Sequence, residues 1–280
     1  MKRCLLGIYE KAFPEELSLF EMISASKKAG YDFFEISIDR TEKRINRLYD
    51  DALINKLVSF CTGVSFRIES IGLSALGTYT LGNENAEIRN KAKDIFVHAV
   101  AFAKRIGARI IQIPACDVPK FDARSKTTHI LFLESLKEIV EIAAREGVLV
   151  GLENMENDYA DTVDKCLRIV KEVNSPYLQL YTDSGNITSA SKLYSIDPLE
   201  DLRKGVGRTI AFHLKETKPN KYGGLFYGEG HVDFPSIVNS ALHLGVRRFV
   251  MEYWYTGNSN WESDLIKAKK MFEEWAGDIE

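Results

Sequence analysis

Short apolar segments rich in β-branched and aromatic residues alternate along the chain with longer segments in which apolar residues recur every three or four positions. Segments of the first kind are typical of buried strands, and the longer spacing is typical of helices that bury one face. The pattern predicts eight strands, at residues 5–10, 33–38, 65–74, 109–113, 149–154, 178–183, 209–215 and 249–254. It predicts helices between them, most clearly at residues 86–106, 128–145 and 161–173.

The regular alternation of strands and helices predicts an α/β fold with a parallel sheet. Four helical segments end at a glycine just before the next strand, where a left-handed C-cap is expected: Gly30, Gly107, Gly147 and Gly245. Eight such units close into a (β/α)8 TIM barrel, and the first strand lacks the Gly-x-Gly-x-x-Gly turn typical of an open, doubly wound sheet. We therefore expect a single TIM-barrel domain over residues 1–280.

Composition narrows the function classes. Hydrophobic residues make up 45% and charged residues 28% of the chain, which is typical of a globular protein with a sizeable core. The net charge of -3, with both signs mixed, argues against nucleic acid as a partner.

The sequence has no apolar run of about 20 residues and no signal-peptide pattern, which indicates no membrane association. The cysteines, Cys4, Cys61, Cys116 and Cys166, are too widely spaced for a disulfide framework, so a cytoplasmic protein with reduced thiols is expected.

Four ionisable residues lie at or near the ends of the last four predicted strands: Glu153, Asp183, His213 and Glu252, on strands five to eight. The carboxyl ends of barrel strands open into one shared mouth, and neighbouring strands lie about 4.8 Å apart, so these side chains should converge. Three carboxylates together would repel one another unless a cation compensates them. The set predicts a site for one divalent metal ion, Mn, Zn, Co or Mg.

Several motifs resemble those of a known family. The matching segments are residues 6–12 (LGIYEKA), 178–186 (LQLYTDSGN), 213–219 (HLKETKP) and 228–234 (GEGHVDF). The chain resembles, nearly end to end, the L-ribulose-5-phosphate (L-xylulose-5-phosphate) 3-epimerase and hexulose-6-phosphate isomerase family of the xylose isomerase-like TIM barrels. The resemblance implies an isomerase of carbohydrate metabolism whose metal is held by the same four residues. Family members are commonly dimeric, and a homodimer is one of the oligomeric states that the sequence leaves open.

A mechanism follows for a ketose substrate. The proton on C3 is acidified by the C2 carbonyl, and a cation that binds O2 and O3 would stabilise the enediolate formed when it leaves. Inverting C3 needs one acid/base group on each face of the carbon, and Glu153 and Glu252 are the natural pair. The expected reaction is 3-epimerisation of a ketose phosphate, of the L-xylulose 5-phosphate to L-ribulose 5-phosphate type.

Further residues are candidates for substrate contacts. The family pattern implies a hydroxyl contact for Glu156, although a solvated loop acid would also fit. Asn186 either binds a sugar hydroxyl or belongs to an ordinary turn. Lys215 and Lys218 lie where barrels often bind phosphate, and Ser74 lies at the end of predicted strand three. The long glycine-rich segment at residues 218–230 is expected to cover the active site, with His231 near the mouth.

One departure from the family pattern widens the range of possible substrates. After strand three, phosphate-using relatives carry a basic L-S-[AG]-H-R-[RK] turn, whereas residues 73–79 of this chain read LSALGTY. An unphosphorylated ketose is therefore an alternative substrate, with Ser74, Thr78 and backbone amides as the remaining phosphate donors.

Three further functions are compatible with a metal-binding barrel. An aldose–ketose isomerase would use a similar metal site. A hydrolase of the endonuclease IV-like kind would carry a richer set of metal ligands, and the near-neutral charge also argues against it. A non-catalytic sugar-binding protein would tend to lose one of the two glutamates, and this chain keeps both.

Overall fold

The computed structural model describes residues 4–277 and shows a closed barrel of eight parallel strands, each hydrogen-bonded to its neighbours in chain order. The strands are β1 (Leu5–Tyr9), β2 (Phe33–Ser37), β3 (Arg67–Gly72), β4 (Ile110–Pro114), β5 (Leu149–Glu153), β6 (Leu178–Asp183), β7 (Thr209–Leu214) and β8 (Arg248–Met251). The eight predicted strands and the predicted (β/α)8 fold are confirmed. The extent of the domain, residues 1–280, stays a prediction, because both ends of the sequence lie outside the described residues.

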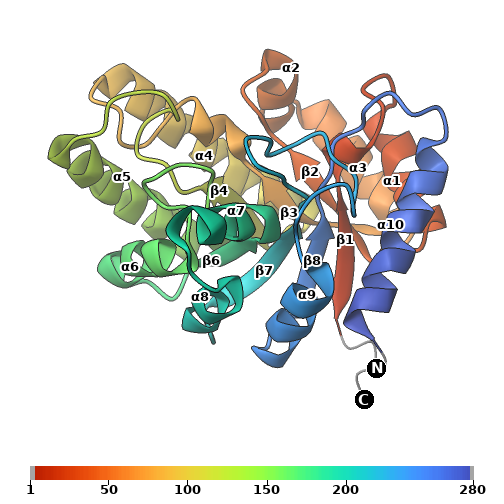
Figure 1. Cartoon of the computed structure of the whole chain (residues 1–280). Helices are drawn as coiled ribbons and strands as arrows, with labels where there is room; N and C mark the ends of the chain where they lie inside the picture. The colour runs from red at the N-terminus through yellow and green to blue at the C-terminus, as the bar shows by residue number, and fades with distance from the viewer. Residues whose placement is uncertain (1–3, 278–280) are drawn as a thin grey trace.

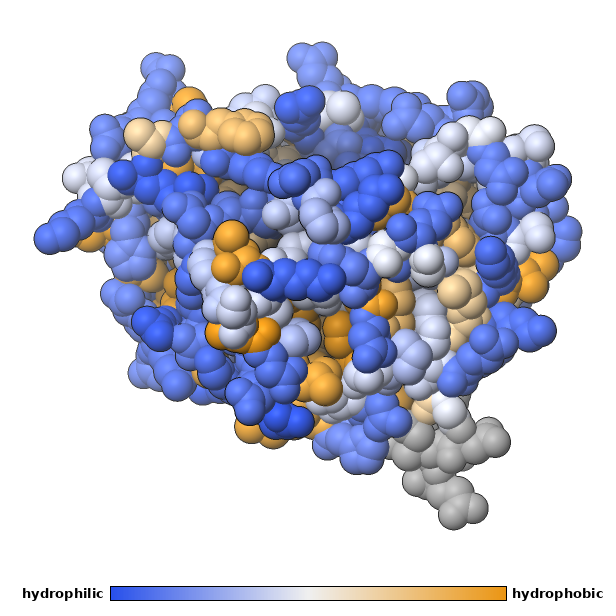
Figure 2. All heavy atoms as spheres, viewed as in Figure 1, coloured by the Kyte–Doolittle hydropathy of each residue, from blue (hydrophilic) through white to orange (hydrophobic). Residues whose placement is uncertain are grey.

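Helices surround the barrel (Figure 1). They are α1 (Leu19–Lys28), α2 (Glu42–Ile45), α3 (Asp51–Gly63), α4 (Ala86–Ile106), α5 (Lys126–Arg145), α6 (Val163–Val173), α7 (Ser184–Tyr194), α8 (Pro198–Lys204), α9 (Phe234–His243) and α10 (Trp261–Ala276), with 3-10 turns η1 (Glu10–Ala12), η2 (Asn46–Leu48) and η3 (Ser74–Gly77). Their outer faces are mostly hydrophilic, as Figure 2 shows for one side of the molecule.

The helix α4 shows how the local sequence determines where an element begins and ends. Asn85 caps its start by accepting a hydrogen bond from the backbone N–H of Glu87, and its apolar face is buried against the barrel. Gly107 ends it with a φ of 80°. Gly30, Gly147 and Gly245 also have positive φ, so the left-handed turns predicted at all four glycines are confirmed.

Strand ends depart from the predicted bounds more than strand centres do. The segment predicted at 65–74 is a strand only over β3, because Ser65 adopts a left-handed turn with a φ of 49° and Ser74 begins η3. Likewise, β8 stops at Met251, so Glu252 is the first residue after the strand. These residues leave the hydrogen-bonded ladder where the chain turns into or out of the neighbouring segments.

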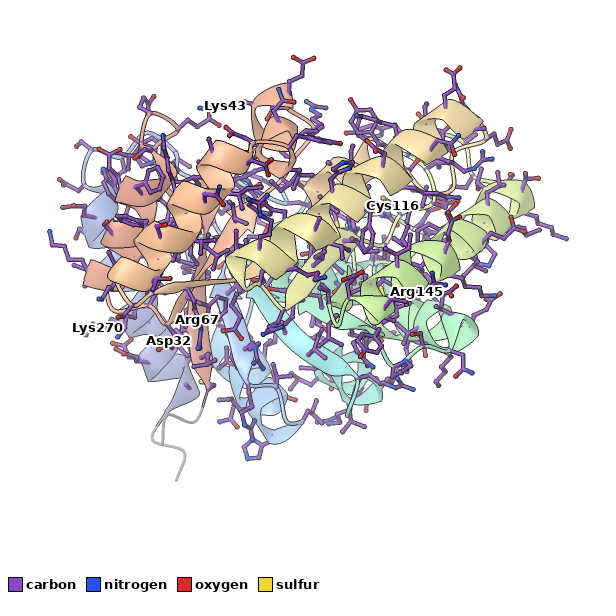
Figure 3. The ribbon with its side chains drawn as sticks, turned by 180° about the vertical axis from the view of Figure 1, so that it is seen from behind. Asp32, Lys43, Arg67, Cys116, Arg145 and Lys270 are labelled. Carbon is purple, nitrogen blue, oxygen red and sulfur yellow. The ribbon has the colours of Figure 1, made fainter. Side chains whose placement is uncertain are left out.

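The interior of the barrel is filled by side chains from six strands, which pack as one cluster: Tyr9, Phe33, Ile110, Tyr181, Ala211 and Val250. Gly151 makes room for this packing, because a Cβ there would lie 2.7 Å from the ring of Tyr181. A larger apolar layer lies between the strands and the helices. Cys61, Cys116 and Cys166 are free thiols, of which Cys116 is labelled in Figure 3. With the interior filled, the polar strand ends are left to form the site.

Candidate active site

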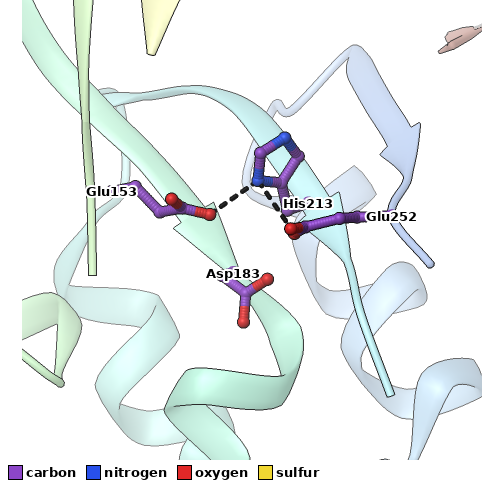
Figure 4. Close-up of side chains that lie close together, drawn as sticks. All are labelled: Glu153, Asp183, His213 and Glu252. Atoms are coloured by element: carbon purple, nitrogen blue, oxygen red, sulfur yellow. Dashed lines mark hydrogen bonds and ion pairs between the residues drawn. The ribbon is translucent and has the colours of Figure 1, made fainter. Parts of the chain in front are cut away.

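Four side chains converge at the carboxyl end of the barrel. Glu153 and Asp183 are the last residues of β5 and β6, His213 lies one residue before the end of β7, and Glu252 directly follows β8. One ligand atom from each residue lies within 4.8 Å of the others, and the side chains face one another in Figure 4. All four are buried, with at most 6% of the residue surface exposed. The structure thus brings together the four residues that the strand-end pattern predicts.

The imidazole of His213 lies at the centre of this carboxylate cluster. Its Nδ1 lies 2.6 Å from Oε1 of Glu153 and 3.1 Å from Oε2 of Glu252. Burial alone would lower the pKa of His213, but the negative charges of Glu252, Glu35 and Glu153 raise it well above its usual value. The surrounding carboxylates therefore favour the protonated imidazole in the metal-free protein.

The carboxylates are held in an environment that disfavours their charge. Burial raises the pKa of Glu153, and Glu252 adds to the shift, against the lowering effect of His213. Burial also raises the pKa of Asp183 well above its usual range; Lys215 opposes this, while Glu252 and Glu153 reinforce it. Groups of like charge are gathered in a space with little water, which is costly without a compensating cation.

The donor set fits a divalent cation. Within residues 4–277, Oδ2 of Asp183 and Oε2 of Glu252 are buried and accept no hydrogen bond, and their nearest cationic groups are Nζ of Lys215 at 3.4 Å and Nδ1 of His213 at 3.1 Å. Buried oxygens of this kind are rare in proteins unless an ion or water binds them. Three carboxylates and one imidazole suit Mn, Zn, Co or Mg, and the donor types do not select among these ions.

Neighbouring side chains that the strand-end pattern does not single out hold these groups in place. Gln112 on β4 donates a hydrogen bond from Nε2 to Oε2 of Glu153 at 2.5 Å. Asn154 accepts a hydrogen bond at Oδ1 from the backbone N–H of Asp183 at 2.8 Å. Glu35 on β2 has its Oε1 2.6 Å from Nε2 of His213. The sequence signal for Glu35 and Gln112 is a polar residue inside an apolar strand segment.

Two predicted substrate residues are engaged within the protein. The buried ammonium group of Lys215 lies 3.4 Å from Oδ2 of Asp183. Burial alone would lower the pKa of Lys215, but Asp183 and Glu252 raise it, so the group is charged. Asn186 lies in the first turn of α7, where its backbone N–H donates to Oδ1 of the N-cap residue Asp183 and its Nδ2 donates to the backbone oxygen of Asn154; a contact with a sugar hydroxyl stays a prediction. Among the described atoms, its Oδ1 has no hydrogen-bond partner.

The remaining predicted contacts lie farther out. Ser74 begins η3 after the end of β3, and its buried Oγ has no partner among the described residues. Glu156 is partly exposed and lies 3.7 Å from the ammonium group of Lys120, while Lys218 is exposed. The Nε2 of His231 lies 3.0 Å from Oγ1 of Thr217. Contacts of these residues with substrate stay predictions.

The segment at residues 218–230 is tied to the end of β7. The buried carboxylate of Glu216 accepts hydrogen bonds from the backbone N–H groups of Thr217, Gly228 and Val232. Tyr227 donates from its hydroxyl to the backbone oxygen of Leu214 at 2.7 Å. The segment is therefore fixed next to the strand that carries His213.

Comparison with known proteins assigns the chain to a family. Residues 23–275 match the family model described as xylose isomerase-like TIM barrel. The chain belongs to this family. It is 34% identical over 274 residues to L-ribulose-5-phosphate 3-epimerase UlaE of Escherichia coli (strain SMS-3-5 / SECEC), covering 96% of this chain and 93% of that protein. The resemblance inferred from the motifs is confirmed, and the chain is an isomerase-class enzyme of the sugar-epimerase kind.

Solved structures agree on the fold. The D-psicose 3-epimerase of Clostridium cellulolyticum H10, determined with D-tagatose, superposes with a TM-score of 0.79 at 19% identity, covering 97% of this chain and 99% of that one. The IOLI protein with a bound zinc atom superposes with a TM-score of 0.78 at 18% identity, covering 97% and 98% of the two chains. Across residues 4–277, no helix combines the length and the apolar character needed to cross a membrane.

Proposed function

We propose that this chain is a divalent-metal-dependent 3-epimerase of a ketose. The observation that carries the proposal is the pair of buried glutamates, Glu153 and Glu252, which reach one ligand cluster from β5 and from the end of β8. Asp183 and His213 lie on the two strands between them. A substrate bound over this cluster would therefore have one carboxylate on each side.

Epimerisation at C3 needs this arrangement. One carboxylate must accept the C3 proton, and the other must deliver a proton to the opposite face. A cation held by Glu153, Asp183, His213 and Glu252 would supply positive charge beside the sugar oxygens that become negative when the proton leaves. The raised pKa of Glu153, caused first by burial, suits a group that must both take and release a proton.

Glu153 and Glu252 are held differently. Gln112 donates a hydrogen bond to Oε2 of Glu153, whereas Oε2 of Glu252 accepts no hydrogen bond among the described residues. Glu153 is thus the more rigidly oriented of the two carboxylates. Asp183 is fixed through the backbone by Asn154 and through Oδ1 by Asn186, so it acts as an anchor that does not exchange protons with the substrate.

The proposed substrate is a ketose phosphate of the L-ribulose 5-phosphate type, as in the name of the Escherichia coli relative. One observation favours an unphosphorylated ketose as the second candidate. The turn after β3, where the motif of the phosphate-using relatives is basic, is the neutral η3, and the buried Lys215 beside the cluster is paired with Asp183. Neither group offers phosphate an unpaired positive charge.

Hydrogen exchange at C3 tests the proposal. Metal-loaded protein is incubated in heavy water with L-ribulose 5-phosphate and, separately, with L-ribulose, and deuterium at C3 is followed by NMR. We expect exchange and the C3 epimer with at least one ketose, and loss of both in Glu153→Gln and Glu252→Gln. Label at C1 with an aldose product would instead identify an aldose–ketose isomerase, and no exchange with any ketose would refute the epimerase.

A further inference from the structure

Glu35 is a buried carboxylate that reaches the cluster from the opposite part of the barrel. It lies on β2, which is separated from β7 by β8 and β1 on the shorter path around the barrel, and it is fully buried. Its Oε1 lies 2.6 Å from Nε2 of His213. Its second oxygen, Oε2, accepts hydrogen bonds from Oγ of Ser70 and from the hydroxyl of Tyr181, each at 2.6 Å.

These contacts decide which ring nitrogen of His213 keeps its hydrogen when a cation binds. Ser70 and Tyr181 both donate to Oε2 of Glu35, and two donors on one oxygen favour the ionised form of the carboxylate, in which Oε1 also acts as an acceptor. An ionised carboxylate has no hydrogen to donate, and therefore Nε2 of His213 must carry the hydrogen that they share. The nitrogen left for a cation is Nδ1. Figure 4 shows it turned toward Glu153 and Glu252, with the second nitrogen turned away.

We propose that Glu35 is a positioning residue, which holds His213 in the tautomer with hydrogen on Nε2 and aims Nδ1 at the cation site. A carboxylate behind a metal-bound imidazole also makes the ligating nitrogen more basic, and removing such a partner typically weakens metal binding about 10- to 100-fold. The inference rests on the proposed function only in requiring that the cluster binds a cation. It assigns to β2 a part in a site whose four clustered residues come from β5, β6, β7 and the end of β8.

The competing explanation is that Glu35 only balances charge inside the barrel. A matched control separates the two, because Glu69 on β3 is also a buried carboxylate in a strand. Glu69 pairs instead with Arg67 and Arg248, at the amino-terminal ends of their strands (Arg67 is labelled in Figure 3). Glu69→Gln therefore removes a buried negative charge without touching His213.

The experiment measures Co²⁺ and Zn²⁺ affinity by competition with a chelator for the wild type, Glu35→Gln, Glu35→Leu and Glu69→Gln. We expect affinity about tenfold weaker in Glu35→Gln and up to about a hundredfold weaker in Glu35→Leu, with Glu69→Gln like the wild type. Glu35→Gln preserves the shape of the side chain, so it remains informative if Glu35→Leu does not fold. In the zinc-loaded wild type, ¹⁵N NMR should show Nδ1 of His213 as the metal-bound nitrogen and Nε2 as protonated.

The outcomes distinguish this inference from the proposed function. Unchanged affinity in a folded Glu35→Gln, or zinc on Nε2 of His213, would overturn the role of Glu35 even if C3 exchange were observed. Weakened affinity in a protein that exchanges no ketose would support Glu35 while refuting the epimerase. A wild-type protein that binds neither ion would overturn both.

Discussion

The Nε2 of Gln112 donates a hydrogen bond to Oε2 of Glu153 at 2.5 Å, while Oε1 of the same carboxylate faces Nδ1 of His213 at 2.6 Å. Both oxygens of Glu153 are therefore directed, one by β4 and the other by β7. The contact is buried, so it does not compete with water. It fixes the rotation of the carboxylate that we propose exchanges a proton with C3.

Replacing Gln112 should therefore slow the reaction. A hydrogen bond to a charged group contributes about 1.5–3 kcal/mol, so Gln112→Ala is expected to lower kcat roughly 10- to 100-fold. Steady-state kinetics with the active ketose measures this. Gln179→Ala is the matched control, because the side chain of Gln179 donates to the backbone oxygen of Pro176 near the start of β6. A kcat in Gln112→Ala equal to that of the control would show that the contact does not orient Glu153.

Metal affinity should depend on pH through His213. The raised pKa of His213, which the three neighbouring carboxylates cause against the effect of burial, means that the metal-free protein holds a proton on the ligating ring at neutral pH. A cation must displace that proton, so affinity falls as pH falls and rises until pH exceeds the raised pKa. We expect about tenfold weaker binding for each pH unit lost below neutrality, and more once Asp183 also binds a proton.

Titration calorimetry with Zn²⁺ in buffers of different ionisation enthalpy measures the protons released. At least one proton per bound ion is expected at neutral pH. Release of none would mean that His213 is neutral in the metal-free protein, and the compensation of the carboxylates by a protonated imidazole would then be wrong.

The barrel and the four clustered residues are predictable from the sequence for the same physical reason. A strand is recognised from the pattern of its own residues, and strand ends in a barrel meet at one mouth. Glu153 and Asp183 can therefore be placed at strand ends without knowledge of any distant contact. Glu35 cannot, because its role depends on which side chain lies opposite it across the interior. The position of Lys215 in the sequence predicts a phosphate contact. Its pairing with Asp183 depends on the rotamers of the two side chains, which the hydrophobic pattern of the strands does not determine.

Removing Lys215 should destabilise the metal-free protein. Its ammonium group is the buried partner of Asp183, and breaking a buried ion pair by removing one member typically costs about 3–5 kcal/mol. Lys215→Met is therefore expected to lower the free energy of unfolding by an amount in that range, measured by urea denaturation with chelator present. Lys218→Met is the control; Lys218 is exposed, and the expected change is within about 0.5 kcal/mol. Equal stability of the two variants would show that Asp183 is neutral when no metal is bound.

The carboxylate of Glu216 should determine whether the segment at residues 218–230 stays attached next to the end of β7. It accepts three backbone hydrogen bonds, two of them from Gly228 and Val232. Glu216→Ala leaves these amides without that partner, and an unpaired buried donor is costly. The backbone of the segment also packs closely against the residues after β7, because a Cβ at Gly230 would lie 2.1 Å from the backbone oxygen of Thr217.

We expect Glu216→Ala to speed proteolytic cleavage within residues 218–230 and to raise KM for the active ketose. Metal affinity should stay close to that of the wild type, because Glu216 is not one of the four clustered residues. Glu229→Ala, which removes the local contact to the backbone N–H of Phe226, should change proteolysis and KM less. Unchanged proteolysis in Glu216→Ala would show that Tyr227, through its bond to Leu214, is sufficient to hold the segment.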